Sequence, residues 1–257
     1  MKTKNLKRWL RFCHYWLGTI VSIQLLIWLG TGIYFNITPS EDLKGTHYYR
    51  SIAPLDLTSF GSHDLEPLSS ILERYKPMEQ VSTIMLNDRP MYLLDERVQQ
   101  YQHNCQQQVV VDAYSGKEVL IDVELAESIA LQSYTGAGEI MSHRQLSTNF
   151  KEWPKECNPL WQVSINDDLN TRIYINGING RLVGHKNDHT DLADLMFKLH
   201  FMDYLHQGSF NNPFSWVFGL MMLILSLTGL YWVIENLVMK RYRFKLNSKL
   251  SSKSKTV

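Results

Sequence analysis

The chain has 257 residues and a formal net charge of +1, with 44% hydrophobic and 20% charged residues. These averages exclude a long disordered chain, a collagen-like chain and a disulfide-dense miniprotein. The lack of a basic excess also argues against a nucleic-acid partner, because phosphates need positive charge to neutralise them. Charge and apolarity are, however, unevenly distributed along the sequence.

Two apolar segments depart from the average. Residues 12–35 contain no Lys, Arg, Asp or Glu, and residues 214–239 contain only Glu235. About 20 apolar residues cross the hydrocarbon core of a bilayer, so both segments are long enough to be transmembrane helices. Two buried core helices of a soluble protein are the alternative. For the first segment a cleaved signal peptide is a further alternative, opposed by its length and by the lack of an A-x-A-like site before residues 38–40.

The charged flanks of these two spans predict their orientation. Residues 1–11 carry five basic residues and residues 240–257 carry seven, and neither flank holds an acidic residue. Because positively charged flanks stay in the cytoplasm, both termini are expected there and residues 36–213 on the opposite side of the membrane. This exported region holds 24 acidic and 14 basic residues, a net charge of −10. The lipid bilayer is therefore an expected partner.

The cysteines fit this arrangement. Cys105 and Cys157 both lie in the exported region, where an oxidising compartment permits a disulfide. In the chain-entropy model a bond across this separation stabilises the region by roughly 4 kcal/mol. The sequence does not establish whether the two residues are close enough to bond, so the bonded and the free state both stay open.

The exported region contains two similar hairpins. Residues 108–120 alternate like a strand around a Ser-Gly pair, residues 172–184 do the same around an Asn-Gly pair, and the two align at a fixed offset of 64. Both pairs favour hairpin turns because glycine accepts a positive φ without steric cost. The elements expected before the hairpins are helices at residues 65–76 and 123–134 and strands at 81–86, 91–94, 139–145 and 160–165.

These elements predict an α+β membrane protein in which two transmembrane helices flank an exported region of two repeats. A final amphipathic helix leads back to the second span. In chain order the expected parts are a basic N-terminus (1–11), the first span (12–35), the exported region (36–213, with repeats at about 60–120 and 121–186 and the linking helix at 191–206), the second span (214–239) and a basic tail (240–257).

A histidine in a membrane span marks a candidate functional site, because a polar, ionisable side chain is costly there. His14 lies inside the first span, and Gly18 and Gly32 follow it at spacings that place them on the same helix face. Glycines on that face allow a flat macrocycle to lie against the helix. An interfacial histidine in contact with lipid headgroups is the alternative.

A second pair of histidines, His200 and His206, precedes the second span. At a spacing of six residues they point about 120° from one another on a continuous helix, so they do not easily hold one metal from one face. Either they serve opposite sides of a cofactor through different subunits, or only one of them is a ligand. Asp203, three residues from each, is within reach to orient a ring nitrogen.

A third pair, His185 and His189, has i, i+4 spacing, and Asp188 and Asp191 are adjacent. Imidazole together with carboxylates suits first-row transition metals, so these four residues form a candidate metal site on the exported surface. Solvated side chains in a polar linker are the alternative.

Several segments resemble the PepSY-associated transmembrane family. The first span resembles the opening helix of that family in RFCHYWLG (residues 11–18) and TGIY (residues 31–34), and the second span repeats the ending as TGLY (residues 228–231). LHF (residues 199–201), followed by NPF (residues 212–214), resembles the closing part of the family. The two hairpins resemble the strand-turn-strand that closes a PepSY module.

The resemblance implies a b-type haem protein of the bacterial inner membrane, with its central region in the periplasm. Family members include reductases that bind haem through membrane histidines and pass electrons outward to ferric iron or ferric siderophores. On that basis His14 is the expected cytoplasmic-side ligand and His200 the periplasmic-side one, while the role of His206 rests on position alone. One or more haem b groups are the expected cofactor, and ferric iron is the expected substrate.

The resemblance also has implications for partners. Better-known members have four spans whereas this chain has two, so we expect a homodimer that assembles four helices. The sequence carries no G-x-G-x-x-G and hence no nicotinamide or flavin module, so quinol or a cytoplasmic reductase is the expected electron donor. A ferrous iron transporter is a further candidate partner. The alternative functions are a non-enzymatic, membrane-anchored inhibitor, chaperone or sensor, and an accessory subunit of such a transporter.

Overall fold

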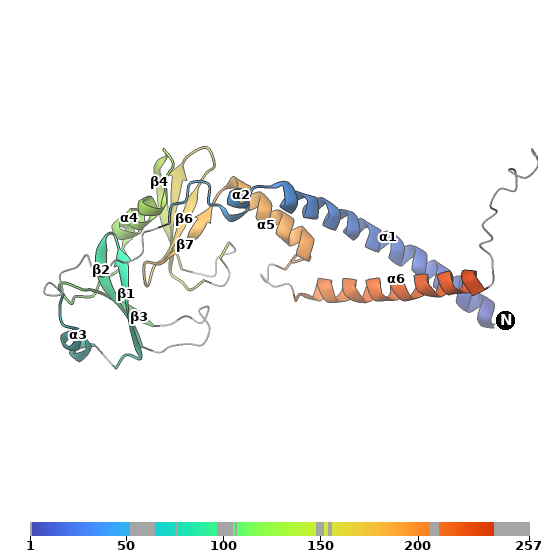
Figure 1. Ribbon diagram of the computed structural model, residues 1–257, viewed down its shortest axis with the longest axis horizontal. Coiled ribbons are helices and arrows are strands. Elements are labelled where there is room, and N and C mark those ends of the chain that lie inside the picture. The colour runs from blue at the N-terminus through green and yellow to red at the C-terminus, as the bar shows by residue number, and fades with distance from the viewer. Residues whose placement is uncertain are drawn as a thin grey trace, which may run out of the picture.

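Two long helices at the ends of the chain flank a head of two antiparallel sheets, which confirms the expected α+β class. The computed structural model describes residues 2–51, 65–75, 77–96, 105, 107–147, 152–153, 156–205 and 211–238. Both long helices extend to one side of the head (Figure 1). In chain order the elements are α1 (Lys2–Ile37), α2 (Ser40–Lys44), α3 (Leu68–Arg74), β1 (Gln80–Leu86), β2 (Arg89–Asp95), β3 (Gln108–Asp112), α4 (Val123–Ser133), β4 (Glu139–Leu146), β5 (Leu160–Asn166), β6 (Arg172–Asn176), β7 (Leu182–Lys186), α5 (Asp188–Phe201) and α6 (Pro213–Val238).

The helices and strands of the head form close to where the sequence predicts them, for local reasons that α4 illustrates. The Asp122 side chain caps the helix by accepting the backbone N–H of Leu125 at 2.9 Å. Ala126, Ile129 and Ala130, which follow at i, i+3 and i+4, are fully buried. The cap and the apolar stripe together determine where α4 begins and which face it buries.

The two hairpins predicted at an offset of 64 share their turn geometry. The carbonyl of Asp112 accepts the backbone N–H of Gly116 at 2.8 Å, and the carbonyl of Asn176 accepts that of Gly180 at 2.9 Å. Both glycines have a positive φ, 63° and 70°. The two hairpins therefore turn in the same way. Beyond the turns the two hairpins differ. The segment after the first turn forms only an isolated bridge to β3, whereas the segment after the second turn forms the strand β7.

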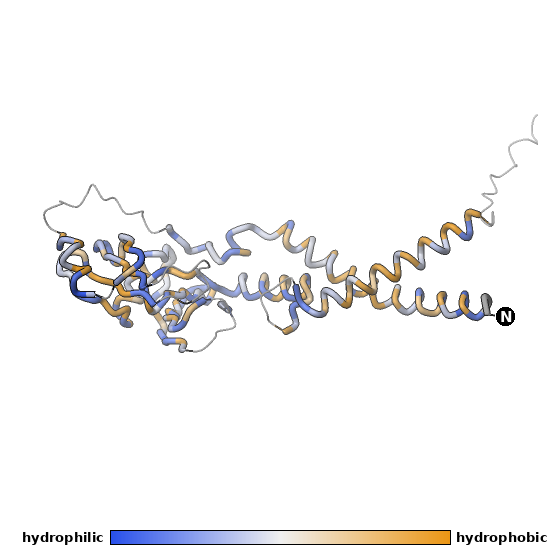
Figure 2. The backbone as a smooth tube through the Cα atoms, turned by 90° about the horizontal axis from the view of Figure 1, so that it is seen from below, coloured by the Kyte–Doolittle hydropathy of each residue, from blue (hydrophilic) through white to orange (hydrophobic). Residues whose placement is uncertain are grey.

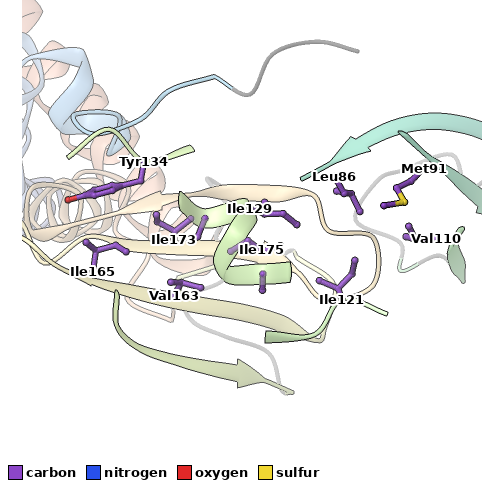
Figure 3. Close-up of a cluster of buried hydrophobic side chains, with 12 residues drawn as sticks. Leu86, Met91, Val110, Ile121, Ile129, Tyr134, Val163, Ile165, Ile173 and Ile175 are labelled. Atoms are coloured by element: carbon purple, nitrogen blue, oxygen red, sulfur yellow. The ribbon is translucent and has the colours of Figure 1, made fainter. Parts of the chain in front are cut away.

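The two sheets share one hydrophobic core. β1, β2 and β3 form an antiparallel sheet in sequence order, and β4, β5, β6 and β7 form the other. Side chains from both sheets and from α4 meet in the core (Figure 3), and its twelve buried members are Leu86, Met91, Val110, Ile121, Ala126, Ile129, Ala130, Tyr134, Val163, Ile165, Ile173 and Ile175. A fully buried aliphatic side chain contributes about 1.5–3 kcal/mol. The two repeats are thus stabilised as one unit.

A disulfide adds a covalent link between the repeats. Cys105, which precedes β3, is bonded to Cys157, which precedes β5, and their Cα atoms are 5.4 Å apart. This is a normal separation for a bonded pair. The bond ties the two sheets together outside their common core.

The two turn glycines offer a matched test of the shared core. Alanine at either position pays the cost of a positive φ, about 1 kcal/mol. A Cβ on Gly180 would in addition lie 2.9 Å from Leu86 Cδ2, inside the core, whereas one on Gly116 would meet the guanidinium of Arg74, at the far end of a long side chain outside that core. We expect Gly180→Ala to lower the free energy of unfolding by about 2 kcal/mol or more and Gly116→Ala by about 1 kcal/mol. Urea denaturation of both variants checks this order, and equal losses would contradict it.

Helices α1 and α6 are long and apolar enough to cross a membrane, over Asn5–Ile37 and Pro213–Val238. Hydrophobic residues follow both helices along much of their length (Figure 2). The helices run antiparallel, so the start of α1 meets the end of α6, where Lys7 Nζ lies 2.5 Å from a Glu235 carboxylate oxygen. The one acidic residue of the second span is therefore paired with a basic residue of the first flank.

The linking helix α5 begins and ends earlier than the predicted residues 191–206. A capping box starts it, because the Asn187 side chain accepts the backbone N–H of Thr190 and the Thr190 hydroxyl accepts that of Asn187. Met202, in the left-handed region at φ 53°, ends it. Helix α5 thus connects the head with the long helices, and its C-terminus lies between α1 and α6 (Figure 1).

Candidate functional site

The candidate site consists of two histidine–threonine pairs at opposite ends of the α1–α6 helix pair. The distal pair, far from the head, is His14 on α1 and Thr228 on α6, with Nδ1 and Oγ1 2.7 Å apart. The proximal pair, next to the head, is His200 on α5 and Thr31 on α1, with the same atoms 2.8 Å apart. Both pairs join residues far apart in sequence.

The threonines determine which ring nitrogen carries the proton. Thr228 Oγ1 lies 2.9 Å from the Ile224 carbonyl, and Thr31 Oγ1 lies 2.8 Å from the Ile27 carbonyl. A hydroxyl has one hydrogen, and in a helix it is commonly donated to the i−4 carbonyl. The lone pairs of each threonine oxygen then accept Nδ1–H of the histidine. We therefore assign the proton to Nδ1 in both histidines, which leaves Nε2 with its lone pair.

Neither Nε2 atom has a hydrogen-bond partner among the residues that the structure describes. In a metal-ligating histidine, Nδ1–H is commonly held by a fixed acceptor, and this orients the lone pair of Nε2 toward the metal. Each histidine is thus oriented by its threonine and presents one nitrogen, Nε2, as a metal ligand.

The proximal histidine is held in position by the way α5 ends. The last carbonyls of a helix lack intrahelical partners. Here the Leu199 carbonyl accepts Gln24 Nε2 at 3.3 Å and the His200 carbonyl accepts Trp28 Nε1 at 2.6 Å, both from α1. The Phe201 carbonyl accepts Asn212 Nδ2 at 2.9 Å. Side chains from α1 and from the start of α6 therefore fix the backbone that carries His200.

The distal histidine lies beside a glycine of the facing helix. A Cβ built on Gly229 would be 3.4 Å from His14 Cε1, so the imidazole occupies the space that this glycine leaves. Close by, the Arg11 guanidinium lies 4.8 Å from the ring centre of Trp232. His14 thus lies about one helical turn from the positive charge of Arg11.

The two glycines predicted to share the face of His14 differ in their surroundings. A Cβ on Gly18 would lie 3.7 Å from Leu225 Cδ1, so this glycine faces α6 and serves the packing of the two helices. A Cβ on Gly32 would have no neighbour within 4 Å among the described atoms. Only Gly32 therefore leaves the open surface that a macrocycle would need.

Two other predicted residues have a different outcome. His206 lies outside the described residues. Asp203, expected to orient a ring nitrogen, donates its backbone N–H to the Lys198 carbonyl, and the nitrogen of His200 is held by Thr31 instead. The group that holds the His200 ring comes from α1, because α5 ends at Met202, before Asp203.

The candidate metal site is not assembled in the structure. His185 lies in β7 with Nε2 2.8 Å from Ser133 Oγ, whereas His189 lies in α5 with Nδ1 2.8 Å from Asp42 Oδ1. Asp188 accepts Asn170 Nδ2, and Asp191 accepts a hydrogen bond from Arg172. Across the described residues no three His, Cys, Asp or Glu side chains are grouped to hold a metal ion. The i, i+4 spacing spans the end of a strand and the start of a helix, so the two rings do not share a face.

His185 is instead a neutral histidine of the head. Its side chain is buried, and burial lowers the pKa of His185 to about 4. Tyr49 packs edge-to-face against the ring, with the ring centres 5.4 Å apart. The residue lies in β7, three residues before the start of α5, where the head joins that helix.

Sequence reasoning did not assign a role to Thr31 or Thr228. The signal was present as the repeated Thr-Gly-x-Tyr near the far end of each span. Because the helices are antiparallel, two copies of this motif lie at opposite ends of the pair, and each copy is next to a histidine from another helix. No family model, curated protein or solved structure matches the chain.

Proposed function

We propose that the chain spans the bacterial inner membrane, binds b-type haem through His14 and His200, and passes electrons across the membrane to ferric iron in the periplasm. The observation that carries the proposal is the pair of histidines whose Nδ1 atoms are held by threonines, one at each end of two apolar helices. A protein that uses these helices only to anchor a binding domain in the membrane would not need histidines oriented in this way.

The exposure of the two helices supports a membrane location over a soluble one. In their most apolar stretches 17% of the residues of the first helix and 6% of those of the second are buried within the chain. Core helices of a soluble protein are largely buried, and a contiguous apolar surface of this length is rare in water. The basic flanks favour an orientation with the distal pair on the cytoplasmic side and the head in the periplasm.

The donor set fits a haem iron. Neutral imidazole nitrogens oriented by a second hydrogen bond are its common protein ligands, and haem when bound supplies reversible one-electron oxidation and reduction. His14 and Thr31 are 17 residues apart on α1, which is about 25 Å of helix. The two levels therefore lie near opposite sides of a bilayer core about 30 Å thick.

The exported region supports a cationic substrate. Its net charge of −10 raises the local concentration of cations such as ferric and ferrous iron near the head. Because no dinucleotide motif is present, electrons enter from quinol or a cytoplasmic reductase. The released ferrous iron is then available to a ferrous iron transporter.

An absorption spectrum of the full chain, purified in detergent from haem-replete cells, tests the proposal. We expect an intense Soret band that sharpens and shifts on reduction, and reoxidation of the reduced protein on addition of a ferric chelate. A well-folded, colourless protein would contradict haem binding. A coloured protein that ferric chelates do not reoxidise would contradict the assignment of ferric iron as the substrate.

A second candidate function is a membrane-anchored binding protein, and one observation favours it. The head contains a pocket of about 270 Å³ between the first sheet, α4 and the β6–β7 turn. Its floor is apolar, with Ile84, Leu93 and Ile129, and Gln132 and Arg181 lie among its polar lining residues. A colourless protein that binds an apolar ligand in the head would favour this alternative.

The threonines give a sharper prediction. Thr228→Val and Thr31→Val keep the side-chain shape but remove the acceptor for Nδ1–H, so the ring loses its fixed tautomer and orientation. We expect each to weaken haem binding at its level by about 10- to 100-fold. Transfer of haem to apomyoglobin measures the loss. Thr→Ser at the same positions is the matched control, and equal haem retention in the valine and serine variants would contradict the assigned role.

A further inference from the structure

Among the residues that the structure describes, each level of the helix pair offers one histidine. The distal level has His14 and the proximal level has His200, and the two are too far apart along the helix axis to reach one iron. The other histidines of the chain all lie between residues 47 and 206, so neither cytoplasmic flank nor α6 contains one. A second imidazole near His14 must therefore come from another chain.

The outer faces of the two helices are suited to such a contact. Gly30 and Gly32 on α1 and Gly219 on α6 have no described atom within 4 Å of a built Cβ, so another helix can approach their backbones closely. Large apolar side chains on both helices are exposed, namely Phe12, Trp16, Ile23, Leu26, Leu29 and Ile33 on α1 and Leu220, Leu223, Leu227, Leu230 and Ile234 on α6.

We propose that a second copy of this chain completes both sites, with identical histidines paired across a twofold axis along the membrane normal. This inference rests on the proposed haem binding. Both copies have the same basic flanks and insert in the same orientation, so a residue of one copy meets residues of the other at its own depth. His14 therefore pairs with His14 of the second copy, and His200 with His200. The dimer has four membrane helices and binds one haem per chain.

Native mass spectrometry of the full chain from detergent, together with the optical spectrum, tests the pairing. We expect a mass of two chains and two haems and a six-coordinate, low-spin spectrum. His14→Leu is expected to give a dimer with half the haem, because the loss at one level leaves the other intact. His206→Ala is expected to keep full haem and the low-spin spectrum, and a loss of the proximal signal in it would overturn the His200 pairing.

A mixed dimer shows directly whether the distal site is shared. Wild-type and His14→Leu chains with different tags are coexpressed and purified through both tags in succession. A shared site predicts that the mixed dimer loses the low-spin distal signal, although it contains one intact His14. A mixed dimer with half of the distal low-spin signal would overturn the sharing.

Two further outcomes separate the dimer from the haem proposal. A monomer with low-spin haem would overturn the dimer and leave the haem proposal standing. A colourless, folded dimer would overturn both the shared haem sites and the haem proposal.

Discussion

His14→Ala and His200→Ala are each expected to remove about half of the bound haem and to lower transmembrane ferric reduction by at least about 100-fold. Loss of a ligand has a larger effect than loss of the group that orients it, and the latter alone costs about 10- to 100-fold in affinity. In the proposed function the two levels act in series across the membrane, so the absence of either is expected to interrupt electron transfer. The measurements are haem content per chain and reduction of a ferric chelate outside proteoliposomes that contain a donor inside.

His143→Ala is the matched control for these variants. His143 is an exposed histidine of the edge strand β4, with Nδ1 2.7 Å from Glu127 Oε1, and it has no contact with the long helices. The same chemical change there should leave haem content and reduction at wild-type values. Normal haem content and normal reduction in both His14→Ala and His200→Ala would rule out these two residues as ligands.

The head could be predicted closely because its signals are local. The turn at Asn179-Gly180 depends on a glycine at positive φ and on the Asn176 side chain, which accepts the backbone N–H of Ile178 at 2.8 Å. The cap of α4 likewise involves residues three apart. Such features are visible in a window of a few residues, so the element order and the repeat followed from sequence alone.

The candidate site was predicted only in part because its second half depends on contacts across helices. His14 was identified from its position in a span, but its partner Thr228 is 214 residues away. For His200, a spacing of three residues suggested Asp203 as the orienting group. The left-handed residue Met202 ends α5 before that turn forms, and Thr31 of α1 takes the place. The antiparallel register of α1 and α6 brings Thr228 to His14, and the packing of α5 against α1 brings Thr31 to His200.

The candidate metal site shows the opposite failure, a local pattern that tertiary structure overrides. Two histidines at i and i+4 share a face only where both lie in one helix or in one strand. Asn187, between His185 and His189, is the N-cap of α5, so the pair is divided between β7 and the first turn of the helix. The two neighbouring carboxylates have partners of their own, since Asp188 accepts a hydrogen bond from Asn170 and Asp191 forms an ion pair with Arg172.

His185 is expected to make the head less stable as the pH falls from 6.5 to 4. Its pKa is about 4 in the folded chain, against an ordinary value of 6.5, because the buried ring is desolvated. Between these values the unfolded chain binds a proton that the folded chain does not, so the free energy of unfolding rises with pH. The stability is fully present above pH 6.5, and about 3 kcal/mol is lost by pH 4.

Urea denaturation of the full chain in detergent, followed between pH 4.5 and 7 by near-ultraviolet circular dichroism of the head, measures this dependence. His185→Gln is the informative variant, because its amide can still bond to Ser133 Oγ but does not titrate. We expect the slope of stability against pH to flatten in this variant. Asp112 and Asp167 have pKa values below 3.8, so their carboxylates affect stability only in more acidic solution. An unchanged slope in His185→Gln would show that another group destabilises the head in acid.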